Sequence, residues 1–328
     1  MTRRRVLIAV LLTPFIAIGL VALYLLVPDL PEEPDAIRTG SIQSGGRTRT
    51  FLYYVPAELR PGAMLLLALH GSMGSGQQMR GFTGYRLERL ADRYGFVVAY
   101  PDGFEGHWND CRANAPYSAN AENIEDVAFV LDLVRYFLEA HQVTPRVYAA
   151  GFSNGGHMAF RLALEEPEVT GAIVALAANL PVPEGNNCSA QPGAVPVMIV
   201  NGTEDPINPY HGGPVTIFGF GNRGNVLSSE NSARFFAERA GMRGEPELSH
   251  LPALESGADE TELDHFSWSR PGVTVELIRV NGGGHSIPQP EGRLPRILGV
   301  TSRQLDAPLA LVQFFLYHHE QARTADVR

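Results

Sequence analysis

One short stretch decides the fold of this 328-residue chain: Gly151-Phe152-Ser153-Asn154-Gly155. It has the pattern G-x-S-x-G, which occurs nowhere else in the sequence. The residues before it, 146–150, favour a short strand, and residues 155–164 favour an apolar helix. This context predicts a tight strand-to-helix turn with a glycine on each side and the Ser153 hydroxyl exposed at its top, where it can act as a nucleophile.

Outward from this turn, strand and helix patterns alternate along the chain. Strands are expected at 47–55, 64–69, 96–100, 146–150, 171–175, 195–200 and 273–280. Helices are expected at 77–94, 123–140, 155–164, 227–240 and 307–318, and loops at 104–121, 181–194 and around 218–224. Alternation of this kind predicts a mostly parallel central sheet flanked by helices. Together with the serine turn it predicts the α/β-hydrolase fold.

A serine hydroxyl needs a base to become nucleophilic, and in this fold the acid and then the histidine follow the serine along the chain. Asp205 lies on the turn after strand 195–200, and His285 follows strand 273–280 through three glycines. We therefore predict a triad of Ser153, Asp205 and His285. Glu204 is the alternative acid, and the histidines with less suitable contexts are His211, His250, His265, His318 and His319.

Acyl transfer also needs N–H donors for the oxyanion. One is expected from the backbone of Asn154, and the other from the glycine-rich loop after strand 64–69, at Ser72 or at Met73. A second polar loop, containing Trp108 and Asn109, is a candidate for substrate binding. The alternative for this loop, that it only packs, stays open.

The composition excludes several other functions. The net charge is −9, which argues against a nucleic-acid partner. All 26 cations are Arg, so Schiff-base chemistry on a lysine is excluded. The two cysteines, Cys111 and Cys188, fit no zinc or redox motif, and we expect no metal site.

The N-terminus indicates export. Three arginines, at 3–5, precede a mostly apolar run at 6–27, which as a helix would be roughly 33 Å long, against a hydrocarbon core of about 30 Å. Acidic residues and prolines follow, so the rest of the chain is expected outside the cytoplasm. We favour an uncleaved membrane-spanning helix, because the run ends without a small-residue cleavage site; a cleaved signal peptide is the alternative, leaving the protein secreted.

This assigns the chain to four parts: the apolar segment 1–27, a linker at 28–46, a catalytic domain at 47–322 and a tail at 323–328. Export also bears on Cys111 and Cys188, which both fall in loops. An isolated pair in an oxidising compartment usually bonds, so a disulfide between them is predicted.

With these residues in place, the chain resembles the polyhydroxybutyrate depolymerase-like esterases, which include feruloyl and acetylxylan esterases. The resemblance runs from about residue 47 to the C-terminus. It rests on Leu69-His70-Gly71-Ser72, Tyr100-Pro101-Asp102-Gly103, Trp108-Asn109-Asp110, Asp126-Val127-Ala128-Phe129, the stretch from Gly151 to Gly156, the stretch from Asn201 to Tyr210, and Gly284-His285.

The resemblance implies an α/β-hydrolase with the same triad, secretion, an ester substrate, and no metal or organic cofactor. In one respect the chain departs from the family. Ser286-Ile287-Pro288-Gln289 follows His285 where many members have Thr-Trp-Pro-Gly, so a feruloyl or polymer preference does not carry over. The expected activity is ester hydrolysis by a serine esterase. Feruloyl or acetylxylan-type hydrolysis, acyl transfer to an alcohol and a non-catalytic binding module are the alternatives.

Overall fold

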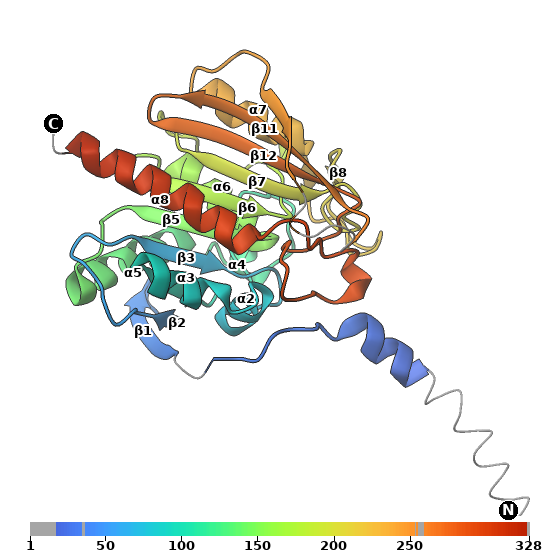
Figure 1. Cartoon of the computed structure of the whole chain (residues 1–328), viewed down its shortest axis with the longest axis horizontal. Helices are drawn as coiled ribbons and strands as arrows, with labels where there is room; N and C mark the ends of the chain where they lie inside the picture. Colours follow the sequence, from blue (N-terminus) through green and yellow to red (C-terminus); the bar gives the residue numbers. More distant parts are fainter. Residues whose placement is uncertain (1–17, 35–36, 253, 255–258, 327–328) are drawn as a thin grey trace, which may run out of the picture.

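The structure is a computed structural model that describes residues 18–34, 37–252, 254 and 259–326. Its centre is a ten-stranded sheet (Figure 1). In spatial order the strands are β1 (Arg38–Ser44), β2 (Arg47–Tyr54), β4 (Val97–Pro101), β3 (Leu65–Leu69), β5 (Val147–Phe152), β6 (Thr170–Leu176), β7 (Val197–Gly202), β12 (Val273–Asn281), β11 (Glu262–Arg270) and β10 (Glu247–His250). The six strands from β4 to β12 run parallel to one another, and the outer strands on both sides are antiparallel. The predicted mostly parallel sheet is therefore confirmed.

Helices cover both faces of this sheet. They are α2 (Gly76–Phe82), α3 (Arg86–Tyr94), α5 (Asp126–His141), α6 (Asn154–Glu165), α7 (Ser229–Arg239) and α8 (Ala307–Asp326); the short helix α4 (Ser118–Ala121) lies in a loop. Side chains of α5, α6 and α7 pack on one face against Leu65 and Leu67, whereas α2, α3 and α8 pack on the other face against Leu66 and Ala68. Successive residues of a strand point to opposite faces, so β3 contributes to both cores and is buried along its whole length.

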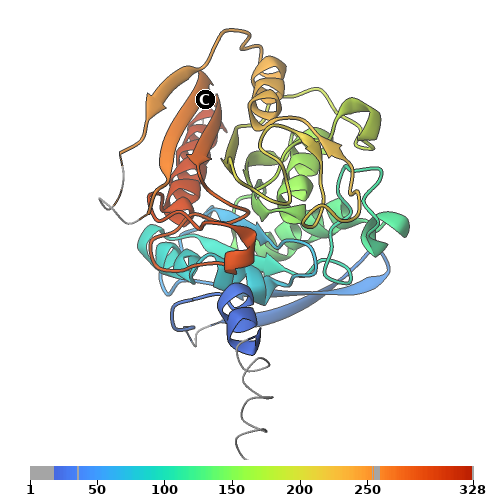
Figure 2. The same ribbon diagram turned by 90° about the vertical axis from the view of Figure 1, so that its right-hand side faces the viewer.

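Short elements occupy the loops at the carboxyl ends of the parallel strands. They are the 3₁₀ turns η1 (Pro183–Gly185) and η2 (Arg296–Leu298) and a small ribbon of β8 (Gly213–Pro214) and β9 (Asn225–Val226). This end of the sheet faces right in Figure 1 and faces the viewer in Figure 2. Parallel strands bring the loops that follow them to the same edge, which is where functional residues of open α/β sheets gather.

Several elements differ from the sequence prediction. The helix expected at 77–94 is two helices, because the chain turns at Thr83–Tyr85, where Gly84 and Tyr85 both have positive φ. The loop expected at 104–121 contains α4, and the last helix continues to Asp326, into the predicted tail. Strands β1, β10 and β11 were not predicted. Strand β1 lies within the stretch expected to be a linker, and it pairs with β2 over its full length.

Residues 18–26 form a helix that protrudes from the body of the molecule (Figure 1). Among the described residues, no helix is long and apolar enough to cross a membrane. Most of the run predicted to span a membrane, 6–27, lies outside the described residues, so the membrane-spanning helix stays a prediction.

Candidate active site

The turn at Ser153 has the strained geometry of a nucleophile elbow. It joins β5 to α6, and Ser153 has φ 54° and ψ −116°, a conformation rarely adopted by a residue with a side chain. Both flanking glycines are required: a Cβ on Gly151 would lie 2.0 Å from the carbonyl oxygen of Gly155, and a Cβ on Gly155 would lie 2.3 Å from that of Leu69. The Ser153 N–H donates to the Leu176 carbonyl at 2.8 Å, which ties the turn to β6.

Asp205 and His285 meet at the ends of the neighbouring parallel strands β7 and β12. The Nδ1 atom of His285 lies 2.7 Å from Oδ2 of Asp205, and both side chains are almost fully buried. The other carboxylate oxygen accepts the backbone N–H groups of Ile207 and Asn208, each at 2.8 Å. These bonds fix the carboxylate and leave the second ring nitrogen of His285 available for a proton from a substrate or a nucleophile. The side chain of Glu204, the alternative acid, is exposed.

The histidine is held against the elbow by ring packing. The centroids of the His285 and Phe152 rings are 5.0 Å apart, and Phe152 immediately precedes Ser153. The backbone N–H of His285 donates to the Leu298 carbonyl at 2.7 Å, which secures its loop. Among the described residues no hydrogen bond joins the Ser153 hydroxyl to His285. In free enzymes this bond is often long and tightens when substrate binds.

The predicted oxyanion loop lies beside the nucleophile. A Cβ placed on Gly71 would lie 3.1 Å from the Phe152 ring and 3.4 Å from the Ser153 Cβ, so this loop packs directly against the elbow. Ser72 follows and donates its hydroxyl to Tyr117 at 2.9 Å, and Met73 has φ 57° and an exposed side chain. The other expected donor, the backbone of Asn154, lies at the N-terminus of α6, where the helix dipole favours negative charge.

The loop containing Trp108 and Asn109 packs behind the nucleophile and supports it, and substrate binding by these two residues stays a prediction. Trp108 is fully buried and its indole N–H donates to the His70 carbonyl at 3.0 Å. The backbone N–H and carbonyl of Trp108 bond to the side-chain amide of Asn154 at 2.8 and 3.1 Å. Asn109 is 6% exposed and its polar groups bond to Asp126 and Ile124. Side chains so engaged hold the loop in place.

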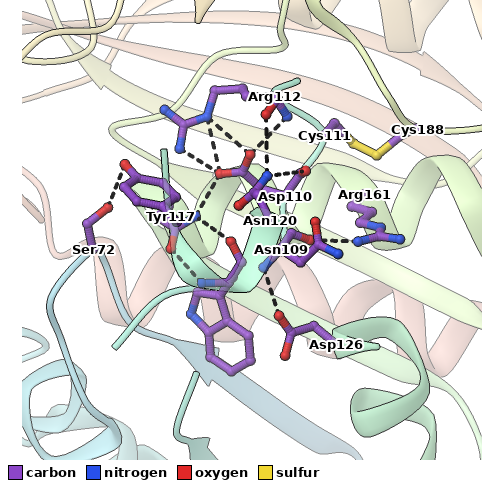
Figure 3. Close-up of polar contacts among 12 residues, drawn as sticks. Ser72, Asn109, Asp110, Cys111, Arg112, Tyr117, Asn120, Asp126, Arg161 and Cys188 are labelled. Atoms are coloured by element: carbon purple, nitrogen blue, oxygen red, sulfur yellow. Dashed lines mark hydrogen bonds and ion pairs between the residues drawn. A yellow bond between two sulfur atoms is a disulfide. The ribbon is translucent and has the colours of Figure 1, made fainter. Parts of the chain in front are cut away.

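Asp110 is the centre of this support (Figure 3). Its carboxylate accepts the Asn154 amide at 2.6 Å and the Arg112 guanidinium at 2.5 and 3.1 Å, and all three side chains are buried. Burial acts to raise the pKa of Asp110, but the charge of Arg112, with a smaller contribution from His157, holds it below its ordinary value. Asp110 therefore stays ionised and restrains the side chain of the residue directly after the nucleophile.

The predicted disulfide is confirmed. Cys111 and Cys188 are bonded, with their Cα atoms 5.0 Å apart, within the range that a disulfide requires (Figure 3). The bond attaches the Asp110 loop to the segment that precedes β7. The loop that supports the nucleophile is thereby linked to the segment leading through β7 to Asp205.

His70, which the sequence analysis quoted only as part of a motif, has a structural role at the site. Its Nε2 accepts the Gly103 N–H at 2.8 Å and its Nδ1 lies 2.7 Å from the Gly71 carbonyl. Burial lowers the pKa of His70 to about 4, so the ring is neutral at pH 7, with the proton on Nδ1. A neutral ring that donates on one side and accepts on the other joins the oxyanion loop to the loop after β4. The signal in the sequence was its place at the end of a buried strand.

The other candidate histidines lie away from this cluster. His250 and His265 are on the outer strands β10 and β11, where they contact Asp264 and Glu276. His318 and His319 are on α8, and His318 lies 2.8 Å from the Thr274 hydroxyl. His211 is exposed. Of the histidines considered from the sequence, His285 alone is placed beside both the elbow and the predicted acid in the described part of the chain.

An elbow serine between β5 and α6, an acid after β7 and a histidine after β12 define an α/β-hydrolase. The chain belongs to the esterase family described as Esterase PHB depolymerase, whose sequence profile matches residues 50–231. It is 31% identical over 297 residues to the putative esterase NocK of Nocardia uniformis subsp. tsuyamanensis. The match covers 86% of this chain and 83% of that protein. Family membership makes this chain a carboxylic ester hydrolase.

Two further likenesses agree with this assignment. A feruloyl esterase B of Piromyces equi is 28% identical over 68% of this chain, and the match spans 40% of that longer protein. The structure of the acetyl xylan esterase from Aspergillus awamori superposes with a TM-score of 0.54 at 15% identity, over 77% of this chain and 95% of that one. At this identity the structural likeness confirms the fold alone.

Proposed function

We propose that the chain hydrolyses carboxylic esters through an acyl-enzyme on Ser153, with His285 as the base and Asp205 as the residue that orients it. The observation that carries the proposal is the 2.7 Å contact between the buried His285 and Asp205, next to a serine held in a strained turn. Three residues that are far apart in the sequence converge at one edge of the sheet in the order that this fold requires.

In the first step the Ser153 oxygen attacks the carbonyl carbon of the ester while Nε2 of His285 takes the hydroxyl proton. Asp205 accepts the Nδ1–H bond, so the ring has its free lone pair on the side of the serine, and the carboxylate stabilises the imidazolium that forms. The oxyanion is held by the N–H of Asn154 and by that of Ser72 or Met73. The carbon–oxygen bond to the alcohol then breaks, and His285 returns the proton to that alcohol.

In the second step water replaces the alcohol. His285 takes a proton from the water, the resulting hydroxide attacks the acyl carbon, and the bond to Ser153 breaks as the serine regains its proton. These steps use side chains and backbone amides alone. They require no metal and no organic cofactor.

We also propose that the catalytic domain works outside the cytoplasm, attached to a membrane through residues 6–27. Two observations support this. The run is apolar and follows three arginines, and the Cys111–Cys188 bond is of a kind that persists in oxidising compartments. We keep 47–322 as the proposed extent of the catalytic domain, extended at its start by the strand β1 that joins the same sheet.

Covalent labelling tests the mechanism. A fluorophosphonate probe should label the intact protein at a single site, and Ser153→Ala should remove both the label and the hydrolysis of p-nitrophenyl acetate. Ser72→Ala is the matched control, because it removes a hydroxyl near the site and keeps the backbone N–H; it should still be labelled. Labelling that persists in Ser153→Ala would place the nucleophile elsewhere.

A further inference from the structure

The segment that follows the N-terminal helix is attached to the catalytic body. Asp29 and Arg293 exchange two backbone hydrogen bonds, at 2.8 and 2.7 Å. The carboxylate of Glu33 forms an ion pair with the buried Arg80 and accepts the Gln77 amide at 2.8 Å. A stretch expected from the sequence to be a free linker is therefore held in place, so the direction in which the helix leaves the body is set.

The helix leaves the body beside the candidate active site. The Arg296 guanidinium donates to the Tyr24 carbonyl at 3.1 Å and stacks over the Tyr24 ring at 4.2 Å. Arg296 begins η2, and Leu298, the last residue of the same turn, accepts the backbone N–H of His285. Figure 2, which views the carboxyl ends of the parallel strands, shows the helix at the lower edge of that face.

Exposed apolar side chains gather at this same end. Of the large hydrophobic residues exposed in the described parts of the chain, seven lie on residues 18–27 and five on loops around the site: Met73, Phe218, Phe220, Ile297 and Val300. The remaining four, Leu138, Leu248, Leu254 and Tyr317, lie on other elements. Phe220 is 79% exposed and Met73 is 72% exposed. Water-exposed apolar groups concentrated on one face indicate an interaction site.

Each of the five loop residues belongs to a loop bonded to the site. Met73 is in the oxyanion loop, next to Ser72. Phe218 and Phe220 are in the loop between β8 and β9, where the Thr216 N–H donates to the Ile207 carbonyl, two residues after Asp205. Val300 accepts the N–H of Gly284, and Ile297 lies within η2. The five apolar residues therefore lie on loops that adjoin the triad.

We propose that this face rests on a lipid bilayer, with the N-terminal helix entering the bilayer and the rim of Met73, Phe218, Phe220, Ile297 and Val300 dipping into its interface. The apolar run that ends at Val27 identifies the partner, because such a run is suited to lipid, and the attached segment 28–34 gives it a fixed position next to the rim. The inference rests on the proposed ester hydrolysis and membrane attachment. It adds the substrate class: esters whose acyl chains are dissolved in the bilayer.

Fluorescence tests the orientation independently of catalysis. The full-length protein is reconstituted in vesicles of phosphatidylcholine and phosphatidylglycerol, with an environment-sensitive dye on Phe220→Cys or, as the control, on Leu138→Cys at the last turn of α5, the opposite end of the sheet. The dye at 220 should shift to the blue and be quenched by lipids with a nitroxide on the acyl chain, and the dye at 138 should do neither. Equal behaviour of the two dyes, or a shift at 220 that depends on protein concentration and not on lipid, would overturn the proposal.

Activity tests the substrate class. The double variant Phe218→Ser/Phe220→Ser should lower the rate on p-nitrophenyl palmitate dissolved in vesicles roughly tenfold, since two interfacial contacts are lost, and leave the rate on p-nitrophenyl acetate in water unchanged. Leu138→Ser should change neither rate. Equal loss on both esters, or on neither, contradicts docking. If the unmodified protein does not hydrolyse p-nitrophenyl acetate, the proposed ester hydrolysis is contradicted, and the fluorescence experiment alone then tests the orientation on the bilayer.

Discussion

Two pairs of a buried carboxylate and a buried histidine lie near Ser153, and the two pairs differ in what surrounds them. In the first pair, which supports the nucleophile, Asp110 faces the full positive charge of Arg112, and His70 is neutral with both ring nitrogens bonded to backbone. In the second pair, Asp205 accepts two backbone N–H groups and contacts His285. No arginine or lysine bonds to Asp205 among the described residues.

The difference separates support from chemistry. The guanidinium of Arg112 offsets the charge of the Asp110 carboxylate, which suits a residue that only restrains Asn154. Asp205 is in a different position, because its charge is balanced mainly by dipoles until His285 becomes protonated. The same two side-chain types therefore form a static support in the pair of Asp110 and His70, whereas in the pair of Asp205 and His285 the carboxylate stabilises the histidine when it becomes protonated.

Asp205→Asn should give the largest effect and should act on catalysis alone. The Asn side-chain oxygen can still accept the N–H groups of Ile207 and Asn208, so the fold should hold. The amide donates where the carboxylate accepted, which turns the His285 ring to the wrong tautomer, and kcat on p-nitrophenyl acetate should fall about 10³-fold or more. Steady-state kinetics and a urea titration measured on the same preparation check both parts. A large loss of stability with kcat retained would reverse the two roles.

Asp110→Asn should act mainly on stability. It leaves the Arg112 guanidinium, which is 2% exposed, without its anion, and breaking a buried pair in this way costs about 3–5 kcal/mol of unfolding free energy. Restoring balance with Asp110→Asn/Arg112→Met should recover part of this loss. The control is Asp132→Asn, which breaks the exposed pair with Arg135 and should cost at most about 1 kcal/mol. Equal urea midpoints for the two single variants would show that the buried pair does not support the fold.

What the sequence predicted well is local and buried. The elbow is encoded within five consecutive residues, and β3 and β5 are short apolar runs of the kind typical of strands covered on both faces. Asp205 and His285 were predicted because each lies in the loop after a predicted strand. Strand β1 was missed for the opposite reason: most of its residues are exposed, its sequence has little apolar alternation, and it is a strand only because β2 pairs with it. Strand β10 is exposed along its whole length and depends likewise on β11.

The support behind the nucleophile could not be derived from local patterns. Asp110 contacts Asn154 across 44 positions of the sequence, and Asn109 contacts Asp126 across 17. A sequence such as Trp108-Asn109-Asp110 is equally suited to line a cleft or to pack beneath one, and the sequence does not give the burial of its side chains. The disulfide was predictable because compartment and loop position, rather than pairing geometry, carried the argument. Composition alone could not show that residues 28–34 are fixed to the body, since those bonds depend on Arg80 and Arg293.

The smallest expected effect concerns His70 and the pH dependence of stability. Burial lowers the pKa of His70 to about 4, whereas the unfolded chain takes up the proton near 6.5. Between these values the unfolded state binds more protons, so the stability that the neutral ring provides is complete above about pH 6.5 and is lost as the pH falls toward 4. His70→Gln keeps one donor and one acceptor but cannot titrate. It should reduce the slope of unfolding free energy against pH in that window by up to about 1.4 kcal/mol per unit, while His157, whose pKa burial lowers to about 3, retains its own share. Urea midpoints at pH 4.5, 5.5, 6.5 and 8 give the slope, and kcat/KM at pH 8 shows whether the oxyanion loop has kept its place. Equal slopes of unfolding free energy against pH in the parent and the variant would mean that His70 is protonated as readily in the folded protein as in the unfolded chain. His70 would then not be the neutral, static histidine that distinguishes it from His285.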